Sequence, residues 1–173
     1  NGRHAAALFD GGYNIYAFDY SADLLRVAQR RHQLRDRLFQ ADVRYLPFGQ
    51  VFSAITLFFT AYGYFDDASN QAVMNCLAQS LRHGGVLMLD LPNPQQVRES
   101  LQPHSRKELA SGLVVDETRY LEGAYVAKDV QIEADGRVQR SYTERVRLYE
   151  EAELTAMAAL AGLQIVDCWP SLV

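Results

Sequence analysis

The chain has 173 residues, of which 49% are apolar and 22% charged, and its net charge is -4. This balance excludes a disordered or collagen-like chain and fits one domain with one core. Because both charge signs are mixed along the chain, a nucleic-acid-binding surface is not expected, and no apolar run reaches the roughly 20 residues of a membrane span.

The first half of the chain alternates predicted strands with predicted helices. An early helical stretch covers residues 5–9, a helix from Ser21 to Arg31 follows, and a third covers 69–81, with Asp66 and Asp67 as caps and Gly84-Gly85 as its end. Apolar, β-favouring runs predict buried strands over residues 14–19, 38–41, 51–59 and 86–91. This alternation predicts a parallel sheet with crossover helices.

The second half has a different pattern. Residues 113–121, 125–133 and 137–149 are rich in Val, Tyr and Thr, and Gly123 and Asp135-Gly136 supply turns between them. They predict a half-exposed, three-stranded antiparallel insertion. A helix over 150–161, ended by Gly162, and one more strand over 163–169 complete the expected order.

Acidic residues close two neighbouring predicted strands. A parallel α/β sheet binds ligands at the carboxyl ends of its strands. Asp19, at such an end, can accept hydrogen bonds from both hydroxyls of a ribose, or it can be an ordinary turn acid. Asp42 can accept from an adenine amino group, or it can cap a turn or pair with Arg44. Gly2, just before the first helical stretch, allows a ligand to approach the backbone closely.

Five segments then occur in a characteristic order: Gly2-Arg3-His4, Asp19-Tyr20-Ser21, Gln40-Ala41-Asp42, Phe59 to Phe65, and Leu81 to Gly85. Together they resemble small-molecule class I S-adenosylmethionine-dependent methyltransferases. The resemblance covers about residues 1–94. It implies an α/β, Rossmann-like fold with a doubly wound, mostly parallel sheet. Residues 1–94 and 150–173 would form an incomplete methyltransferase core. Residues 95–149 would form an antiparallel β insertion that serves as a lid, substrate or dimerisation subdomain.

The resemblance also implies the cofactor, S-adenosylmethionine, and its product, S-adenosylhomocysteine. The implied cofactor residues are Gly2 and Arg3 at the methionine part, Asp19 at the ribose, Asp42, Tyr20, Leu24 and Val43 at the adenine, and Phe58 and Phe59 near the sulfonium. An aromatic ring can stabilise that cation, although ordinary core packing is the alternative for each ring. His4, Tyr62 and Tyr64 are the expected substrate contacts. Transfer of an activated methyl depends largely on positioning, so no catalytic residue is assigned.

The sequence departs from the family at both ends. The family's first strand and the leading part of its glycine-rich loop would precede residue 1, and a final antiparallel strand would follow residue 173. Unless this or another chain supplies the family's first strand, we expect the affinity for the cofactor to be reduced. Ser53 stands where relatives usually carry an acid, and Leu57 stands where an Asn is common.

Three functions therefore compete. The first is methyl transfer to a small molecule, and the second is a truncated, inactive methyltransferase-fold protein that serves as a binding or interaction module. The third is an NAD-binding oxidoreductase, because an acid after the second strand also serves NAD. Exposed sheet edges or the insertion predict a possible homodimer. Cys76 and Cys168 are expected to be buried thiols in a cytoplasmic protein, there is no signal-peptide pattern, and the histidines have no metal-ligand spacing.

Overall fold

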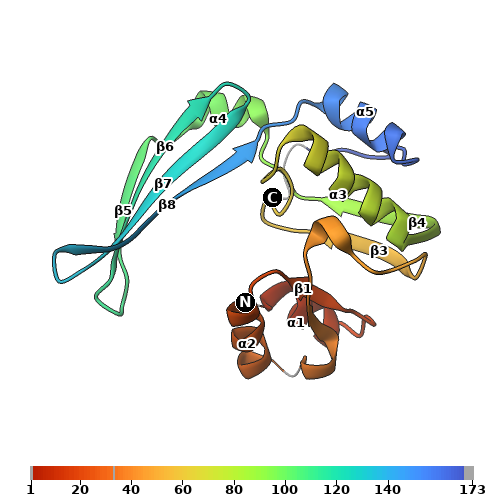
Figure 1. The fold of residues 1–173 in the computed structure, drawn as a ribbon, viewed down its shortest axis with the longest axis horizontal. Coiled ribbons are helices and arrows are strands. Elements are labelled where there is room, and N and C mark those ends of the chain that lie inside the picture. The colour runs from red at the N-terminus through yellow and green to blue at the C-terminus, as the bar shows by residue number, and fades with distance from the viewer. Residues whose placement is uncertain (1, 33, 170–173) are drawn as a thin grey trace.

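The computed structural model describes residues 2–32 and 34–169. The fold is α/β, with parallel strand pairs flanked by helices and an antiparallel sheet that extends to one side (Figure 1). The helices are α1 (Arg3–Asp10), α2 (Ala22–Arg31), α3 (Asp67–Ser80), α4 (Pro94–Ser100) and α5 (Glu151–Leu160), with short 3-10 helices over Arg35–Arg37 and Val43–Tyr45. The strands are β1 (Ala17–Asp19), β2 (Leu38–Gln40), β3 (Phe52–Leu57), β4 (Leu81–Leu89), β5 (His104–Glu108), β6 (Val114–Glu122), β7 (Tyr125–Ala134) and β8 (Arg137–Arg147).

The parallel strands form two separate pairs where the sequence predicted one sheet. β1 pairs with β2, from Ala17 opposite Leu38 to Asp19 opposite Gln40, and β3 pairs with β4. Among the described residues, no strand hydrogen bonds join the two pairs. A strand between β1 and β3 would complete a single parallel sheet. The family resemblance expects such a strand ahead of residue 1, outside the 173 residues, and it stays a prediction.

The main core lies between the β3–β4 pair and helices α3 and α5. Val73, Met74 and Leu77 of α3 are buried at helical spacing and pack with Leu57 and Tyr149. The predicted cap of α3 is confirmed for Asp66, whose carboxylate accepts the Ser69 N–H at 2.7 Å. Asp67 instead lies in the first turn of the helix, where it contacts the other end of the chain.

Helix α2 and its contact with α1 explain why residue 2 is glycine. Ser21 caps α2 as expected, because its hydroxyl accepts the Leu24 N–H at 3.3 Å. Gly2 has φ +81°, and a Cβ on it would lie 2.7 Å from the Cβ of Ala28. Close packing of α2 against the start of α1 therefore requires glycine there, independently of any ligand.

The prediction that Gly84-Gly85 ends a helix is wrong. Helix α3 already ends at Ser80, and β4 begins at Leu81 and runs through both glycines. The ladder between β3 and β4 shifts register next to them, between Phe52 and Ala54. Gly84 has φ +74°, so it permits an irregular turn of the strand that an L-residue adopts only with strain.

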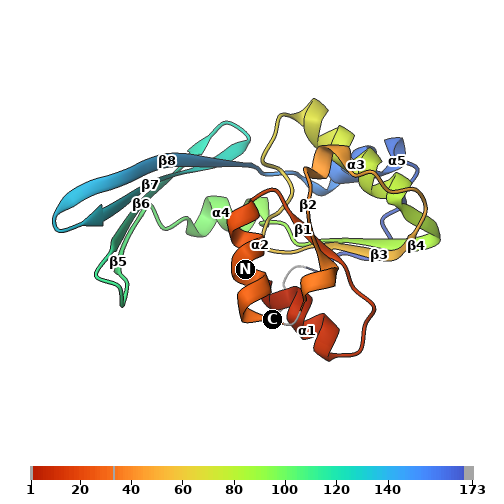
Figure 2. The same ribbon diagram turned by 60° about the horizontal axis from the view of Figure 1, so that its bottom comes forward.

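The antiparallel sheet has four strands in the order β5-β6-β7-β8, not three. The sequence did not reveal β5 because its residues, His104–Glu108, have no apolar alternation, and it pairs through its backbone with β6. In Figure 2, α4 lies between this sheet and the parallel pairs.

Two predictions near the end of the chain are also wrong. Residues 163–169 form no strand, because Ile165 and Val166 are exposed and have no ladder partner within the part of the chain that the structure describes. Cys168 is exposed rather than buried, and Cys76 is only half-buried. Cys76, in α3, accepts the Leu46 N–H at 3.2 Å and so packs this helix against the segment that precedes β3.

Asn70 in α3 is fully buried, and its side chain donates to the Phe65 carbonyl at 2.7 Å and to the Tyr149 hydroxyl at 2.9 Å. Asn70→Ala removes both bonds and leaves buried polar groups unpaired, so we expect the free energy of unfolding to fall by about 2–4 kcal/mol. Urea denaturation measures this. Asn75→Ala is the matched control on the same helix and should cost under about 1 kcal/mol, and equal losses in both variants would contradict the assignment.

Candidate functional site

The first part of the site lies where β1 and β2 end. Asp19 is half-buried, and its Oδ1 accepts the Ser21 N–H at 2.8 Å. The Asp19 carbonyl accepts the Ala41 N–H at 3.2 Å, and Gln40 Nε2 donates to the Tyr20 carbonyl at 2.9 Å. No described residue donates a hydrogen bond to Asp19 Oδ2. The carboxylate is thus held at one oxygen and keeps the other for a ligand.

Asp42 pairs with Arg44, which is the alternative that the sequence left open. The guanidinium Nη2 donates to Asp42 Oδ2 at 2.6 Å, and Nε and the Arg44 N–H both donate to Oδ1 at 3.0 Å. These hydrogen bonds lower the pKa of Asp42 to about 2. The carboxylate is therefore charged at neutral pH, and a further donor would share oxygens that Arg44 already engages.

Apolar surface surrounds the tips of β1 and β2. Tyr20 is 73% exposed and Leu24 is 44% exposed, so both offer uncovered apolar area next to Asp19. Val43 is half-buried and packs against the core beside α3. Two exposed apolar side chains beside a partly engaged carboxylate suit a flat, partly polar ligand.

The second part of the site is the turn that follows β3. Phe59 and Thr60 both have left-handed backbones, with φ of 55° and 57°. This conformation costs a non-glycine residue about 1–2 kcal/mol, and such strain concentrates at functional sites. The end of β4 holds the turn: Asp90 Oδ2 accepts the Phe59 N–H at 2.9 Å, and the Asp90 carbonyl accepts the Thr60 N–H at 3.1 Å.

The start of α1 packs against this turn. The His4 ring lies 5.0 Å from the rings of both Phe58 and Phe59 and is nearly parallel to Phe59. The guanidinium of Arg3 lies over the Phe59 ring at 4.2 Å, a cation–π contact. Arg3 Nε donates to His4 Nε2 at 3.3 Å. Burial and the Arg3 charge lower the pKa of His4, against the opposite effect of Asp90, so the imidazole is neutral at pH 7.

The two tyrosines expected at the substrate lie in different surroundings. Tyr62 is a core residue, 2% exposed, and its hydroxyl donates to the Asn70 carbonyl at 2.9 Å. Tyr64 is partly exposed, and burial and the Glu144 charge raise its pKa. Tyr64 is therefore a neutral phenol beside the antiparallel sheet, whereas Tyr62 is removed from any surface a ligand can reach.

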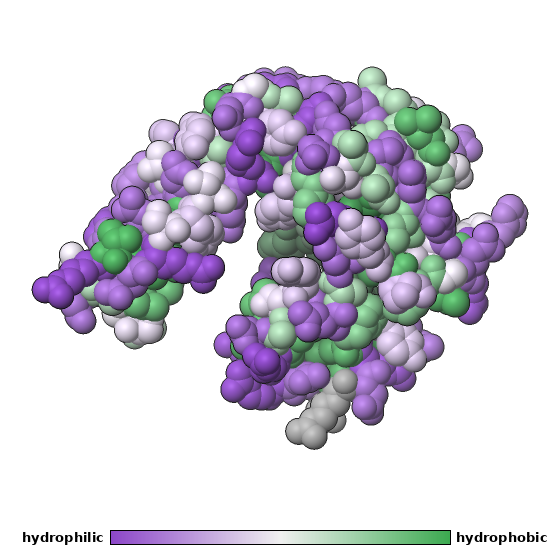
Figure 3. Space-filling model, viewed as in Figure 1, coloured by the Kyte–Doolittle hydropathy of each residue, from purple (hydrophilic) through white to green (hydrophobic). Residues whose placement is uncertain are grey.

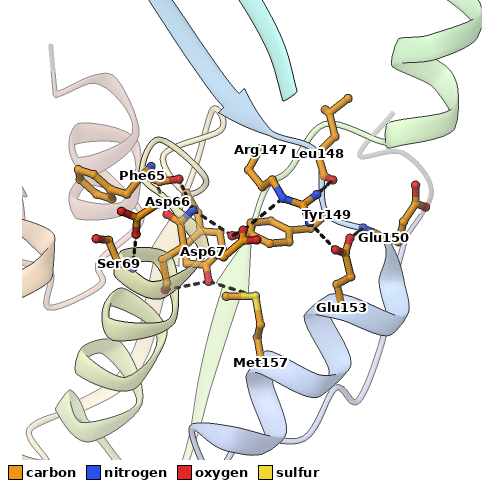
Figure 4. Close-up of polar contacts among 12 residues, drawn as sticks. Phe65, Asp66, Asp67, Ser69, Arg147, Leu148, Tyr149, Glu150, Glu153 and Met157 are labelled. Atoms are coloured by element: carbon orange, nitrogen blue, oxygen red, sulfur yellow. Dashed lines mark hydrogen bonds and ion pairs between the residues drawn. The ribbon is translucent and has the colours of Figure 1, made fainter. Parts of the chain in front are cut away.

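An ion network around the buried Arg147 side chain joins the antiparallel sheet to the core (Figure 4). Arg147, the last residue of β8, donates to Asp67 of α3 at 3.2 Å and to Glu153 of α5. The Tyr149 hydroxyl also donates to Asp67, at 2.9 Å. The Arg147 N–H donates to the Gly63 carbonyl at 2.8 Å, beside Tyr64. The C-terminal end of β8 is therefore fixed to Gly63, in the segment that follows the turn at Phe59 and Thr60.

Sequence reasoning missed two functional candidates. Asp90 ends a strand just as Asp19 does, so the same rule could have found it. Arg147 had no signal, because its partners are 80 and 6 residues away along the chain. Thr60 lies in the predicted Phe59 to Phe65 segment, but its left-handed backbone could not be predicted from a threonine side chain.

The space-filling view shows the molecule hollowed between the antiparallel sheet and the α1–α2 part (Figure 3). Another open cleft, of about 610 Å³, lies away from the strand tips and is lined by Phe9, Gln29, Arg30, Arg31, His32, Asp36 and Arg37. Over residues 2–32 and 34–169, no three His, Cys, Asp or Glu side chains gather as metal ligands. Within the same ranges, no helix combines the length and apolar character needed to cross a bilayer.

The comparisons found one matching protein family and a fold shared with several solved structures. The methyltransferase domain family matches residues 1–85. CcbJ, a methyltransferase from Streptomyces caelestis, superposes with a TM-score of 0.79 at 21% identity over 96% of this chain and 70% of its own. The sugar N-methyltransferase KedS8 from a Streptoalloteichus species gives 0.75 at 20% identity, over 94% and 68%.

A third structure, the amino pentose methyltransferase CalS10 from Micromonospora echinaspora, solved with bound S-adenosylmethionine, gives a TM-score of 0.70 at 20% identity over 93% and 70% of the two chains. The chain spans about two thirds of the length of the solved structures it matches, 66% for one from Clostridium acetobutylicum. Among curated proteins, none matches the sequence. At these identities the structures show a shared fold.

Because the turn after β3 is strained, we expect a glycine substitution in it to raise the stability of the protein. Thr60→Gly removes the cost of φ 57°, so we expect the free energy of unfolding to rise by about 1 kcal/mol. Thr56→Gly, the same change inside β3, should lower it by about 1 kcal/mol, since glycine weakens a strand. Chemical denaturation of both variants measures the pair, and a loss of stability in Thr60→Gly would contradict the strained turn.

Proposed function

We propose that this chain, whose residues 1–85 match the methyltransferase domain family, transfers a methyl group from S-adenosylmethionine to a small-molecule acceptor. The observation that carries the proposal is the pair of strand tips at the ends of β1 and β3. One tip presents Asp19 with a carboxylate oxygen to spare beside exposed Tyr20 and Leu24. The other presents Phe59, whose ring is 64% exposed and lies next to Arg3 and His4 at the start of α1.

The residues of these tips fit the chemical parts of the cofactor. Asp19 Oδ2 would accept a ribose hydroxyl, and Tyr20 and Leu24 would cover the apolar faces of the adenine. Asp42 would accept from the adenine amino group with oxygens that it shares with Arg44, and Val43 would border the ring. The Arg3 guanidinium would pair with the methionine carboxylate, beside the Gly2 backbone. Phe58 and Phe59 would border the sulfonium.

The bound cofactor would supply an electrophilic methyl group, which the acceptor's lone pair would take while the electron pair of the methyl–sulfur bond stays on sulfur. The protein orients the acceptor and excludes water. An amine or hydroxyl acceptor also loses a proton. His4 Nε2 accepts from Arg3 Nε in this structure, so this imidazole could take that proton only once the Arg3 guanidinium pairs with the cofactor carboxylate. Tyr64, whose pKa is raised, stays a phenol and donates a hydrogen bond instead.

The acceptor site that we propose lies between the strand tips and the antiparallel sheet. Lys128 on this sheet forms ion pairs with Glu117, at 3.5 Å, and with Glu144, at 2.6 Å. The Glu144 charge also raises the pKa of Tyr64, and Tyr64 follows Phe59 closely along the chain. Such a surface suits a polar acceptor with hydroxyl and amino groups. The amino pentose and sugar substrates named for two similar structures support an amino sugar as the acceptor class.

The wider organisation follows from the same proposal. Residues 1–94 and 150–173 serve as the methyltransferase core, and residues 95–149 as its substrate or dimerisation subdomain. β8 has one unpaired edge over Arg137–Arg147 within the described chain, which suits pairing with a second copy. Mixed charge along the chain supports a small-molecule acceptor over nucleic acid, and we propose that the protein is cytoplasmic.

Asp19→Ala tests the cofactor site. The change removes the acceptor for the ribose, so affinity for S-adenosylmethionine and S-adenosylhomocysteine should fall by about 10- to 100-fold. Calorimetric titration measures it, with NAD as the negative ligand. Asp23→Ala, an exposed carboxylate in the first turn of α2 that pairs with Arg26, is the matched control and should bind as the wild type does.

The outcomes separate the competing functions. Loss in Asp19→Ala alone supports the methyltransferase site. Binding of NAD by the wild type would favour an oxidoreductase. Folded wild-type protein that binds none of the three ligands would contradict the enzyme and leave the interaction module.

A further inference from the structure

We propose that Asp90, at the end of β4, is a positioning residue that fixes the Phe59 ring against the cationic sulfonium of the cofactor. The inference rests on the proposed function and deepens it. Asp90 lies outside every motif that carries the family resemblance. Its position is argued from the hydrogen bonds, backbone angles and ring contacts of the turn that follows β3.

Asp90 holds this turn with three hydrogen bonds. Its carboxylate accepts the Phe59 N–H at 2.9 Å, and its carbonyl accepts the Thr60 N–H at 3.1 Å. Its own N–H donates to the Leu57 carbonyl at 2.9 Å. The backbone bonds continue the β3–β4 ladder by one residue. The carboxylate bond is the one that the side chain adds, and it acts on the residue whose ring is exposed.

The held conformation is one that Phe59 and Thr60 do not adopt by preference. Two successive left-handed residues, at φ 55° and 57°, relax to an extended or right-handed backbone unless their surroundings prevent it. Relaxation at residue 59 would turn its side chain away, because the direction of Cβ follows φ. The Asp90 carboxylate opposes this relaxation directly.

The Phe59 ring already makes a cation–π contact within the protein. The Arg3 guanidinium lies 4.2 Å from the centre of the Phe59 ring, and the ring is 64% exposed. A face that accepts a guanidinium also accepts a sulfonium, since both are cations attracted to the ring quadrupole. When the Arg3 guanidinium pairs with a carboxylate of the ligand, the sulfonium a few bonds away occupies the aromatic face.

The discriminating measurement compares two ligands that differ in charge. S-adenosylmethionine is cationic at sulfur, and S-adenosylhomocysteine is a neutral thioether. Asp90→Ala frees the ring and should weaken the first selectively, so the ratio of their dissociation constants should rise about 3- to 30-fold over the wild-type ratio. Phe59→Leu should raise the ratio by a similar factor, and the double variant should add little to either single change.

The conservative variant separates position from charge. Asp90→Asn keeps an oxygen acceptor for the Phe59 N–H but removes the negative charge, so it should restore the wild-type ratio to within about twofold. A ratio in Asp90→Asn equal to that in Asp90→Ala would show that the charge acts on the sulfonium directly, and would overturn the positioning role. Equal weakening of both ligands in Asp90→Ala would show a structural role only, and would also overturn it.

Amide hydrogen exchange in the cofactor-free protein supplies an independent measurement. The Phe59 amide should lose protection in Asp90→Ala and keep it in Asp90→Asn, and unchanged protection in Asp90→Ala would overturn the inference. A wild-type protein that binds neither ligand would contradict the proposed function and this inference together. Wild-type binding of both ligands with an unchanged ratio in Asp90→Ala would contradict this inference alone.

Discussion

The buried charge of Arg147 is the constraint on which the arrangement of the two halves depends. A cation that is 9% exposed requires partners, and it finds them on two helices, at Asp67 of α3 and Glu153 of α5. Burial opposes the charge, but the two carboxylates raise the pKa of Arg147. Because Arg147 is also the last residue of β8, satisfying its charge determines where the antiparallel sheet joins the core.

The strand tips depend on this junction through a short segment. The Gly63 carbonyl accepts the Arg147 N–H, and a Cβ on Gly63 would lie 3.1 Å from the Arg147 carbonyl. Gly63 lies three residues beyond Thr60, so the strained turn is held by Asp90 at one end and by β8 at the other. The polar surface around Lys128 and Tyr64 is thereby kept on the side of the methyl-transfer site that we propose. One set of contacts therefore supports both of the binding regions that we propose.

Local signals in the sequence predicted most elements and the strand-end acids. Ser21 and Asp66 cap helices as predicted, and Asp19 ends β1 as predicted. These features were predictable because they depend on residues that are close together in the sequence. Non-local pairing was not predictable: β5 forms only because β6 offers a backbone partner, and Gly84-Gly85 continues a strand that pairs with β3. The same distinction between local and non-local contacts applies to the candidate site residues. The pairing of Asp42 with Arg44 was foreseen as an alternative, whereas Tyr62 became a core residue because Asn70, eight residues away, bonds its hydroxyl.

The most direct test of the account is a crystal structure of this chain with S-adenosylhomocysteine. The account predicts a ribose hydroxyl within hydrogen-bond distance of Asp19 Oδ2 and the thioether sulfur beside the Phe59 ring. Both contacts are needed, because they are the two strand tips that together define the site. A ligand bound elsewhere, or bound with Asp19 facing solvent, would contradict the account.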